Sequence, residues 1–569
     1  MTAHPTADGE GLERVRAAVR RLGTGPLRRR EPWWARGFDR ELHPWLLSDE
    51  ERGNDASGLP AWRVGNDARL LVDGRTYLPA LARALAAAGP RDAVLFAGWR
   101  ADPDELLDDG GPPVSAALVG AAVRGVSVHG LLWRSHSEVL GYTYRANRDL
   151  ARAVTRAGGQ VLLDHRVRSL GSHHQKFLVR TRPDGDAGGD DADVAFVGGI
   201  DTAHARRDGG THPGDRQTRP FSEVYGPTPA WHDVHLGLSG PAVRDVETVF
   251  RQRWADPAPL TRWPWHTLPD RLSGLARVPR PLPAAAPPPA PAGTCTVQLL
   301  RTHPRRRPAY PFAPDGERSV ARGYAKVLAR ARRLVYVEDQ YLWSREVARI
   351  FAAALRRSPS LHLIAVVPRF VDREGRFDFL NSLMGQNAAW RTVVQAGGDR
   401  VQLLDLENEA GRPVYVHAKV CVVDDVWAAV GSANLNRRSW THDSELTVAV
   451  LDEERDGREP VDPGGLGDGA RGFARRLRLA LMREHLGRDD GDDADLLDPD
   501  QAADAVRRAS AALEEWHAGG CAGPRPVGRL RTHPRRTGGP LQRPLVRPVY
   551  DLAYDPDGRP WSMRLRRAF

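Results

Sequence analysis

Cysteine and long apolar runs are scarce in this chain of 569 residues. Only three cysteines occur, Cys295, Cys421 and Cys521, and they show neither a CxxC spacing nor a disulfide framework. This usage is typical of a reducing compartment. No run of about 18 apolar residues is present, which argues against a membrane span, and the N-terminus lacks the apolar segment of a signal peptide. These absences predict a cytoplasmic protein whose contact with a membrane is at most peripheral.

Lysine is also rare. Among 82 basic residues only Lys176, Lys326 and Lys419 are lysines, and the rest are arginines. Two of the three lysines follow a histidine by two positions, in the tripeptides HQK and HAK that begin at His174 and His417. Arginine presents a planar fork, whereas lysine presents a compact point charge. The placement therefore indicates that a compact charge is needed beside each of these histidines.

The length and charge of the chain set the class of protein. A chain of 569 residues is too long for one ordinary core and suits two large domains or two fused halves. Hydrophobic residues make up 41%, which is enough for globular interiors. The net charge of +10 and the pI of about 9.9 favour acidic partners such as phospholipid head groups, nucleic acid or other phosphate esters, although an arginine-rich soluble surface explains them equally well.

Helical and short apolar segments alternate along two long regions. Predicted helices over 78–88, 114–123 and 145–157 each precede an apolar strand, as do helices over 319–331 and 345–355, which predicts α/β sheets with covered faces. A further amphipathic helix is predicted over 499–516. The resulting domain boundaries are 1–60 for an N-terminal extension, 61–276 for a first half, 277–293 for a Pro/Ala-rich linker, 294–490 for a second half, and 491–569 for a C-terminal helix and basic tail.

The two halves contain an internal repeat. The sequence HHQKFLV from His173 corresponds to VHAKVCV from Val416, and VAFVGGID corresponds to AAVGSAN. The first copy is longer between its two parts, and the Asp/Gly-rich run 184–193 accounts for the difference as a surface loop. A histidine and a lysine two positions apart on a strand point to the same face. The glycine turn that follows offers N–H groups and short polar side chains to an anion.

The second copy, HAKVCVVDD from His417, fits the H-x-K-x4-D pattern of the phospholipase D superfamily. The blocks WHDVH from Trp231 and EDQY from Glu338 resemble the eukaryotic-type branch of that superfamily, as found in single-chain bacterial members. The first copy departs from the pattern, because Thr181 stands where the family has Asp. The resemblance implies an α/β fold of two similar sandwich halves, each a mixed sheet flanked by helices, related by a pseudo-twofold axis.

The resemblance also implies a reaction and its residues. One histidine attacks phosphorus to form a phosphohistidine, and the other protonates the leaving alcohol. By analogy His174 is the nucleophile and His417 the acid, with Asp233 expected to orient His174 and Glu445 to orient His417. The implied catalytic residues are His174, Lys176, His417, Lys419, Asp424, Asp233 and Glu445. The implied phosphate-binding residues are Lys176, Lys419, Ser432, Asn434, Gly198, Gly199 and Asp201.

No set of His, Cys or carboxylate residues occurs at metal-ligand spacing, so neither a metal nor a cofactor is predicted. The predicted partner is a phospholipid at a membrane surface, and both motifs in one chain favour a monomer. The leading hypothesis is hydrolysis of glycerophospholipids to phosphatidic acid, with transfer to alcohols. The alternatives are a cardiolipin synthase-like phosphatidyltransferase, a nuclease of the same superfamily, which two motifs in one chain disfavour, and a non-catalytic phospholipid-binding protein.

Overall fold

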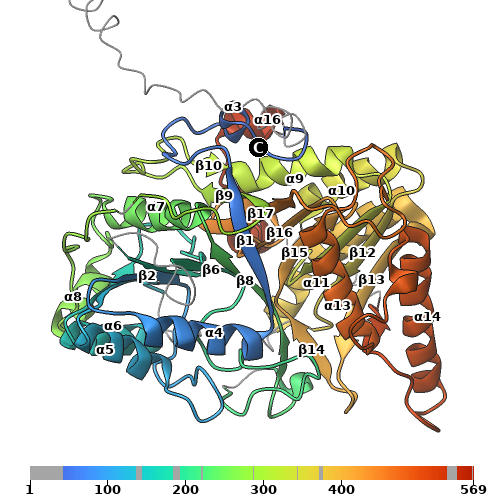
Figure 1. Ribbon diagram of the computed structural model, residues 1–569, viewed down its shortest axis with the longest axis horizontal. Helices are drawn as coiled ribbons and strands as arrows, with labels where there is room; N and C mark the ends of the chain where they lie inside the picture. The colour runs from blue at the N-terminus through green and yellow to red at the C-terminus, as the bar shows by residue number, and fades with distance from the viewer. Residues whose placement is uncertain are drawn as a thin grey trace, which may run out of the picture. The chain divides into compact units, whose positions relative to one another are not determined.

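The first half forms a mixed sheet in a computed structural model of the chain (Figure 1). Its strand order is β4-β3-β2-β5-β6-β8-β1, with β2, β3 and β4 parallel and the other neighbours antiparallel. The strands are β1 (Arg63–Val72), β2 (Ala93–Gly98), β3 (Ser127–Trp133), β4 (Gln160–Asp164), β5 (Phe177–Thr181), β6 (Val194–Gly198) and β8 (Val234–Ser239). The structure describes residues 43–135, 144–182, 193–218, 222–285, 287–342, 344–370, 376–534, 548–566 and 568–569. Residues 184–192 of the expected Asp/Gly-rich loop lie outside these ranges.

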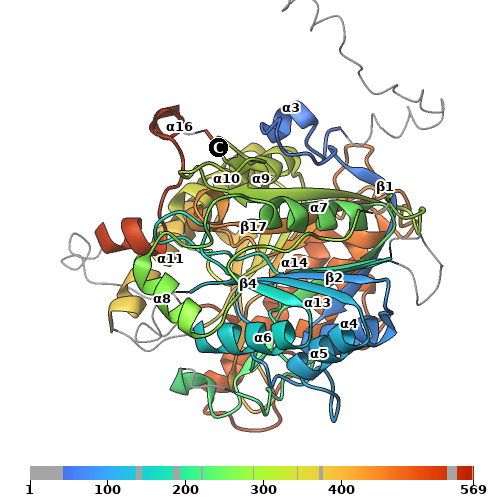
Figure 2. The same cartoon turned by 90° about the vertical axis from the view of Figure 1, so that its left-hand side faces the viewer.

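Helices cover both faces of this sheet (Figure 2). The three helices on one face are α4 (Gly74–Ala87), α5 (Val114–Val123) and α6 (Tyr144–Arg156), and the single helix on the opposite face is α7 (Ala242–Trp254). The predicted helices over 78–88, 114–123 and 145–157 correspond to the first three. In α4 and α6 the apolar residues recur on one side, whereas α5 is apolar almost all round, and the buried residues of all three pack on the sheet as one hydrophobic cluster.

The second half repeats this order as β13-β12-β11-β15-β16-β17-β9. Its strands are β9 (Cys295–His303), β11 (Leu334–Asp339), β12 (His362–Val366), β13 (Val401–Glu407), β15 (Lys419–Val423), β16 (Trp427–Gly431) and β17 (Glu445–Asp452). Its helices are α9 (Ser319–Arg330), α10 (Arg345–Arg357), α11 (Arg376–Gly397) and α13 (Gly472–Leu486), and α13 packs on β15, β16 and β17. The repeated order confirms the prediction of two similar α/β halves.

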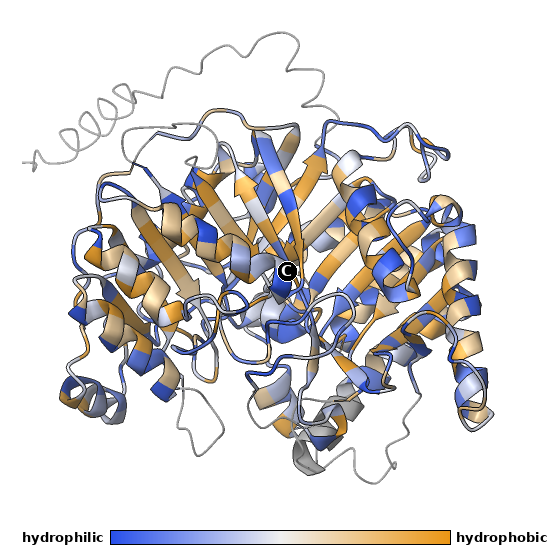
Figure 3. Cartoon of the chain, turned by 60° about the horizontal axis from the view of Figure 1, so that its bottom comes forward, coloured by the Kyte–Doolittle hydropathy of each residue, from blue (hydrophilic) through white to orange (hydrophobic). Residues whose placement is uncertain are grey.

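The two halves meet along their strands. β1 pairs antiparallel with β9, and β7 (Ala230–His232) pairs in parallel with β14 (Pro413–Val416). One hydrophobic cluster contains residues of both sheets together with α7 and α13. The strands are largely apolar along their length, whereas helix surfaces carry hydrophilic residues (Figure 3). The halves therefore share a core, which fixes the ends of β7 and β14 relative to one another.

The C-terminal region packs on the second half. β18 (Leu530–Thr532) pairs with β13, and α14 (Pro499–Ala518) contacts β12 and β18. Arg559 pairs with Glu346 of α10 at 2.6 Å. The shorter elements are α3 (Asp49–Arg52), η3 (Glu223–Tyr225), α8 (Pro264–Leu272), β10 (Glu317–Arg318), η4 (Gly398–Arg400), α12 (Arg437–Thr441), η5 (Ala494–Leu496), η7 (Tyr550–Tyr554) and α16 (Trp561–Arg566). Among the described residues, every helix is too short or too polar to cross a bilayer.

Candidate active site

Each of the two motif histidines contacts a carboxylate from the other half of the chain. His174 Nδ1 lies 2.9 Å from Glu445 Oε2, and His417 Nδ1 lies 2.6 Å from Asp233 Oδ2. This corrects the expected pairing, in which Asp233 was assigned to His174 and Glu445 to His417. The four residues are nevertheless brought together. Asp233 follows β7, which runs beside β14 and His417, and Glu445 begins β17 directly after Ser444, whose carbonyl oxygen is bonded to His174.

Backbone pairing explains the exchange. The His174 N–H donates to the carbonyl oxygen of Ser444 at 2.9 Å, and the His417 N–H donates to that of His232 at 2.7 Å. Ser444 and His232 each immediately precede an orienting carboxylate, so the two contacts are related by the pseudo-twofold repeat. A histidine is therefore fixed to the other half by its main chain as well as by its ring.

The two histidine side chains are partly exposed, whereas their carboxylate partners are fully buried. The side chains of His174 and His417 retain 15% and 8% of their exposure, whereas those of Glu445 and Asp233 retain 0% and 1%. A contact at Nδ1 directs the other ring nitrogen, Nε2, away from the carboxylate. Each imidazole is thus oriented from behind by a buried acid, which is the arrangement that suits a nucleophile or a proton donor.

The site is rich in positive charge. Burial, followed by the ammonium groups of Lys176 and Lys419, holds the pKa of His174 well below its usual range. Burial, Lys419 and Arg206 do the same to the pKa of His417. Burial also lowers the pKa of Lys419 to about 8, and burial together with Asp443 raises the pKa of Glu445 to about 8. An arriving anion offsets the positive charge and raises the pKa of both imidazoles, so the site suits a phosphodiester.

Each motif lysine reaches back to its own histidine. Lys176 Nζ donates to the His174 carbonyl oxygen at 3.1 Å and lies 3.3 Å from Asp201 Oδ2. Lys419 Nζ donates to the His417 carbonyl oxygen and to Gln340 Oε1, the latter at 3.3 Å. Both ammonium groups are almost fully buried. A compact charge fits this narrow space, which accounts for lysine at these two positions in an arginine-rich chain.

The first glycine turn was expected to bind phosphate, and its backbone is engaged elsewhere. The Gly198 N–H donates to the Lys176 carbonyl oxygen and the Gly199 N–H to that of Val234. A Cβ at Gly199 would lie 2.0 Å from Asp233 Oδ1, so glycine is needed there for the close approach of Asp233. Asp201 Oδ1 accepts the N–H of Trp99 at 3.0 Å. These three residues support Asp233 and Lys176.

The two polar side chains of the second glycine turn, Ser432 and Asn434, have different environments. Ser432 Oγ donates to Glu445 Oε2 at 2.6 Å, so its proton is engaged with the orienting acid and is not left for a phosphate. Asn434 is buried, and its Oδ1 atom has no hydrogen-bond partner among the described residues. The unpaired atom is an acceptor, so only the amide N–H groups of Asn434 could contact a phosphate, whereas Ser432 holds the acid in place.

Asp424 was included among the catalytic candidates, but it has a structural role. Its carboxylate accepts the N–H groups of Arg332, Arg333 and Leu334, each at 2.8 Å, and thereby holds the start of β11. Thr181, at the corresponding position of the first half, is the last residue of β5 and pairs with Ala93. The departure from the family pattern at Thr181 thus lies at the remote end of a strand and does not involve the reacting groups.

Arg206 is a site residue that the sequence did not reveal. Its guanidinium lies 3.5 Å from the centre of the Trp231 ring, whose centre in turn lies 4.9 Å from that of the His417 ring, with the two ring planes tilted by 39°. Arg206 is 9% exposed, and its Nε atom has no hydrogen-bond partner among the described residues. It follows a loop without a motif in a chain full of arginine, so no sequence signal distinguishes it.

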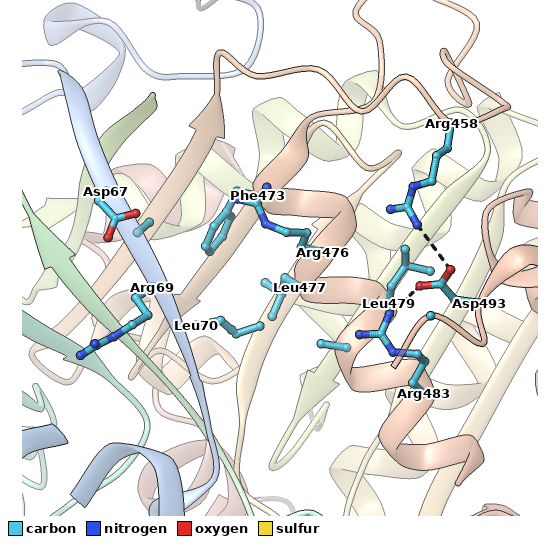
Figure 4. A pocket seen from close by; sticks show the side chains of 13 residues that line it. Asp67, Arg69, Leu70, Arg458, Phe473, Arg476, Leu477, Leu479, Arg483 and Asp493 are labelled. Atoms are coloured by element: carbon cyan, nitrogen blue, oxygen red, sulfur yellow. Dashed lines mark hydrogen bonds and ion pairs between the residues drawn. The ribbon is translucent and has the colours of Figure 1, made fainter. Parts of the chain in front are cut away.

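A separate cavity of about 610 Å³ lies between β1 and α13. Its polar lining includes Asp67 of β1, Arg476 of α13 and an ion-paired group in which Arg458 and Arg483 both contact Asp493, at 3.4 and 2.5 Å (Figure 4). None of the motif residues lines it. Because its charges are largely paired with one another, the cavity offers no group placed for the chemistry of the two histidines.

The chain matches two family models. The one described as Phospholipase D matches residues 118–279 and 401–521, and the one described as Cardiolipin synthase, PLD-like domain, matches residues 324–456. Both motif histidines fall inside the first model, one in each matched segment.

Among curated proteins, the chain is 25% identical over 516 residues to Phospholipase D1 of Saccharomyces cerevisiae, a match that covers 75% of this chain and 29% of the yeast protein. It is 24% identical over 519 residues to Phospholipase D beta 1 of Arabidopsis thaliana, covering 70% of this chain and 47% of that protein. The chain thus spans less than half of the length of these two relatives. Among solved structures, phosphatidylserine synthase of Haemophilus influenzae matches with a TM-score of 0.48 and 11% identity, over 72% of this chain and 87% of that one.

Proposed function

The chain belongs to the phospholipase D superfamily, and from this premise we propose that it is a phosphodiesterase that cleaves glycerophospholipids to phosphatidic acid and a free head-group alcohol. One observation carries the proposal. Two imidazoles are each oriented at Nδ1 by a buried carboxylate of the other half, and the charges of both buried lysines act on both of them. Two oriented bases in a cationic pocket suit displacement at a phosphodiester better than simple binding.

The proposed reaction has two steps. His174 Nε2 attacks phosphorus, the bond from phosphorus to the head-group oxygen breaks, and His417 Nε2 gives its proton to the departing alkoxide. Water or an alcohol then loses a proton to His417 and attacks phosphorus, and the bond from phosphorus to His174 breaks. Lys176, Lys419 and the amide N–H groups of Asn434 stabilise the negative charge on the phosphoryl oxygens. Each step inverts phosphorus, so the proposed outcome is net retention.

The second step leads to the test of the proposal. Since the site accommodates one alcohol oxygen on departure, a primary alcohol should compete with water for the phosphohistidine. Phosphatidylcholine vesicles with added ethanol should yield phosphatidylethanol in proportion to the ethanol, while choline release changes little if formation of the intermediate limits the rate. Only phosphatidic acid at high ethanol, or inverted phosphorus in a chiral substrate, would contradict the two-step mechanism.

Phosphatidyl transfer to a second lipid is the alternative that a specific observation favours, since residues 324–456 match the model described as Cardiolipin synthase, PLD-like domain. The same intermediate would then be resolved by the hydroxyl of phosphatidylglycerol. Incubation with phosphatidylglycerol alone distinguishes the two, because a transferase forms cardiolipin and a hydrolase forms phosphatidic acid. Parallel samples with single-stranded DNA test nuclease activity, and the absence of any product would favour a binding protein.

Contact with a membrane is part of the proposal, and helix α8 supports it. Trp265, Leu268 and Leu272 of this helix are 63%, 61% and 81% exposed, and Trp263 stacks on Trp265. Exposed tryptophan and leucine on a short helix favour the interface of a bilayer. Trp265→Ala combined with Leu268→Ala should weaken sedimentation with phosphatidylcholine vesicles, while hydrolysis of a soluble short-chain lipid stays unchanged.

A further inference from the structure

A second group of histidines and carboxylates lies buried behind the candidate active site. It consists of Asp73 at the end of β1, His212 in the loop after β6, His232 of β7 and Glu484 of α13, and we refer to these four residues as the buried cluster. Each offers one nitrogen or oxygen atom, and the four atoms lie within 4.8 Å of one another. The residues come from four separate segments, so no local spacing in the sequence could reveal them.

The distances between these atoms are those of ligands around a common centre. His232 Nδ1 lies 3.0 Å from Asp73 Oδ1 and 3.1 Å from Glu484 Oε1, and His212 Nε2 lies 3.3 Å from the same Glu484 atom. Ligand atoms bound to one tetrahedral zinc ion at about 2.0–2.1 Å lie about 3.3 Å apart. The separations in the buried cluster are therefore close to those of a four-coordinate site.

These close contacts are at ion-pair distance, at 3.0–3.3 Å. Among the described residues, His212 Nε2, His232 Nδ1 and Glu484 Oε1 have no hydrogen-bond partner, and neither does Asp73 Oδ2. Asp73, His212 and His232 are each no more than 1% exposed. Buried polar atoms are normally paired, because an unpaired one costs about 1–3 kcal/mol. Several buried atoms that converge at ion-pair distance without hydrogen bonds suit one shared cation as their partner.

The second nitrogen of each histidine faces a further carboxylate. His232 Nε2 lies 2.8 Å from Glu338 Oε2, and Glu338 is held in turn by the Tyr336 hydroxyl at 2.6 Å. His212 Nδ1 lies 3.5 Å from Asp208 Oδ2. A histidine that binds a metal usually donates its other N–H to a carboxylate, which fixes the tautomer and strengthens the ligand. His232 has this arrangement, whereas His212 Nδ1 only approaches its carboxylate.

We propose that Asp73, His212, His232 and Glu484 bind one divalent transition-metal ion of the zinc type. Two imidazoles and two carboxylates suit zinc, and the closed, buried site leaves no open position for a substrate, so the ion is structural. Its charge offsets the two acids of the buried cluster. The proposal replaces the expectation of no metal that the sequence spacing suggested.

The ion would stabilise the position of an orienting carboxylate. Asp233 follows His232 directly, its carbonyl oxygen accepts the Asp73 N–H at 2.8 Å, and its own N–H donates to Asp73 Oδ1 at 3.2 Å. The carbonyl oxygen of His232 holds the His417 N–H. The ion thus links β1, β7 and α13 directly behind the Asp233–His417 pair, at a place where it cannot contact phosphorus.

The test measures metal rather than activity, so its outcome does not depend on the proposed function. The full chain, expressed with added zinc and dialysed, should contain about one zinc per chain by elemental mass spectrometry. His212→Gln should lower zinc affinity by more than about 100-fold. His303→Gln is the matched control, because His303 is equally buried outside the buried cluster, and it should retain the zinc of the unmodified protein.

The unmodified protein provides a second measurement in case His212→Gln does not fold. Protein stripped by a strong chelator under mild denaturation and then refolded should regain a higher Tm on addition of zinc, and crystals should show anomalous scattering at the buried cluster. Less than about a tenth of an equivalent of any transition metal, with no rise in Tm on addition of zinc, would overturn the proposal. Equal zinc in His212→Gln and His303→Gln would overturn it as well.

Discussion

The two half-sites hold their histidines by the same main-chain hydrogen bond, but different side chains surround the residue that precedes each orienting acid. Glu445 is preceded by Ser444, whose hydroxyl accepts a hydrogen bond from Arg253 Nη1 at 2.9 Å, and Arg253 is paired with Asp164 at 2.6 Å. Asp233 is preceded by His232, which belongs to the buried cluster. In one half the support is a guanidinium at the end of α7, and in the other it is a set of metal-type ligands that includes Glu484 of α13.

This difference shows which part of the repeat the chemistry needs. The carbonyl oxygens of Ser444 and His232 hold the two histidines in the same way, so the main-chain contact is kept in both halves. The side chains beneath differ in charge and in type. The buried side chains around Ser444 and His232 therefore only need partners for their own polar groups. The orienting carboxylates and the carbonyl oxygens of Ser444 and His232 must keep their positions in both halves.

The largest expected effect comes from removing either histidine. His174→Ala and His417→Ala should each lower turnover of phosphatidylcholine by at least about 10⁴-fold. A substrate with a nitrophenol leaving group separates the two roles, since such a group departs without a proton. That substrate should restore the first step in His417→Ala but not in His174→Ala, measured as a burst of nitrophenol. Recovery in His174→Ala alone would reverse the two assignments.

The orienting carboxylates should differ in their effects. Asp233→Asn should lower kcat by about 10²–10⁴-fold, because the amide disturbs the tautomer of His417. Glu445→Gln should cost only about 10-fold at pH 7, because burial and Asp443 raise the pKa of Glu445 to about 8 and leave its carboxyl only partly ionised at that pH. Steady-state kinetics on both variants measures whether Asp233→Asn loses more kcat than Glu445→Gln. Equal losses would show that the two half-sites use their acids in the same way.

The pH dependence of kcat/KM should report the loss of positive charge from Lys419. Its pKa is lowered to about 8, so the free enzyme loses this positive charge as the pH rises through that value, and kcat/KM should fall up to about tenfold per pH unit above it. Bound phosphate favours the charged lysine, which moves the corresponding decline in kcat to higher pH. Lys419→Arg should remove the decline at a lower overall rate. Glu445→Gln serves as the control and should retain it.

The smallest effects concern the remote ends of the motif strands. Asp424→Ala leaves three backbone N–H groups without their acceptor and should destabilise the protein by about 1–3 kcal/mol. Thr181→Ala should cost less than about 1 kcal/mol, because in the first half Asp92 and Arg182 pair near this place at 2.9 Å. Urea unfolding measures both. A larger loss of specific activity in Thr181→Ala than in Asp424→Ala would contradict the structural role.

The sequence predicted much of the fold because apolar periodicity records which face of an element is buried. The helix expected over 114–123 is α5 (Val114–Val123), and the one over 319–331 is α9 (Ser319–Arg330). It also predicted His174 and His417 as a pair, since a repeated motif with rare lysines is a strong local signal.

The remaining features depend on contacts between distant segments. The exchange of Asp233 and Glu445 between the histidines follows from the pairing of β7 with β14 and from the bond of His174 to Ser444, which no single half encodes. Likewise, the glycine turn alone predicts that the N–H groups of Gly198 and Gly199 bind an anion. In the folded chain both N–H groups donate to backbone carbonyl oxygens instead. Arg206 and the buried cluster have no local pattern at all.

The exchange of carboxylates has a consequence for how the two halves change over time. A half that loses its acid keeps its own histidine oriented and instead impairs the histidine of its neighbour. Neither half can therefore become dispensable, because a substitution that removes the acid of one half impairs the histidine of the other half. Selection acts on the pair as a single unit, even though the side chains that support each copy from below have been free to diverge.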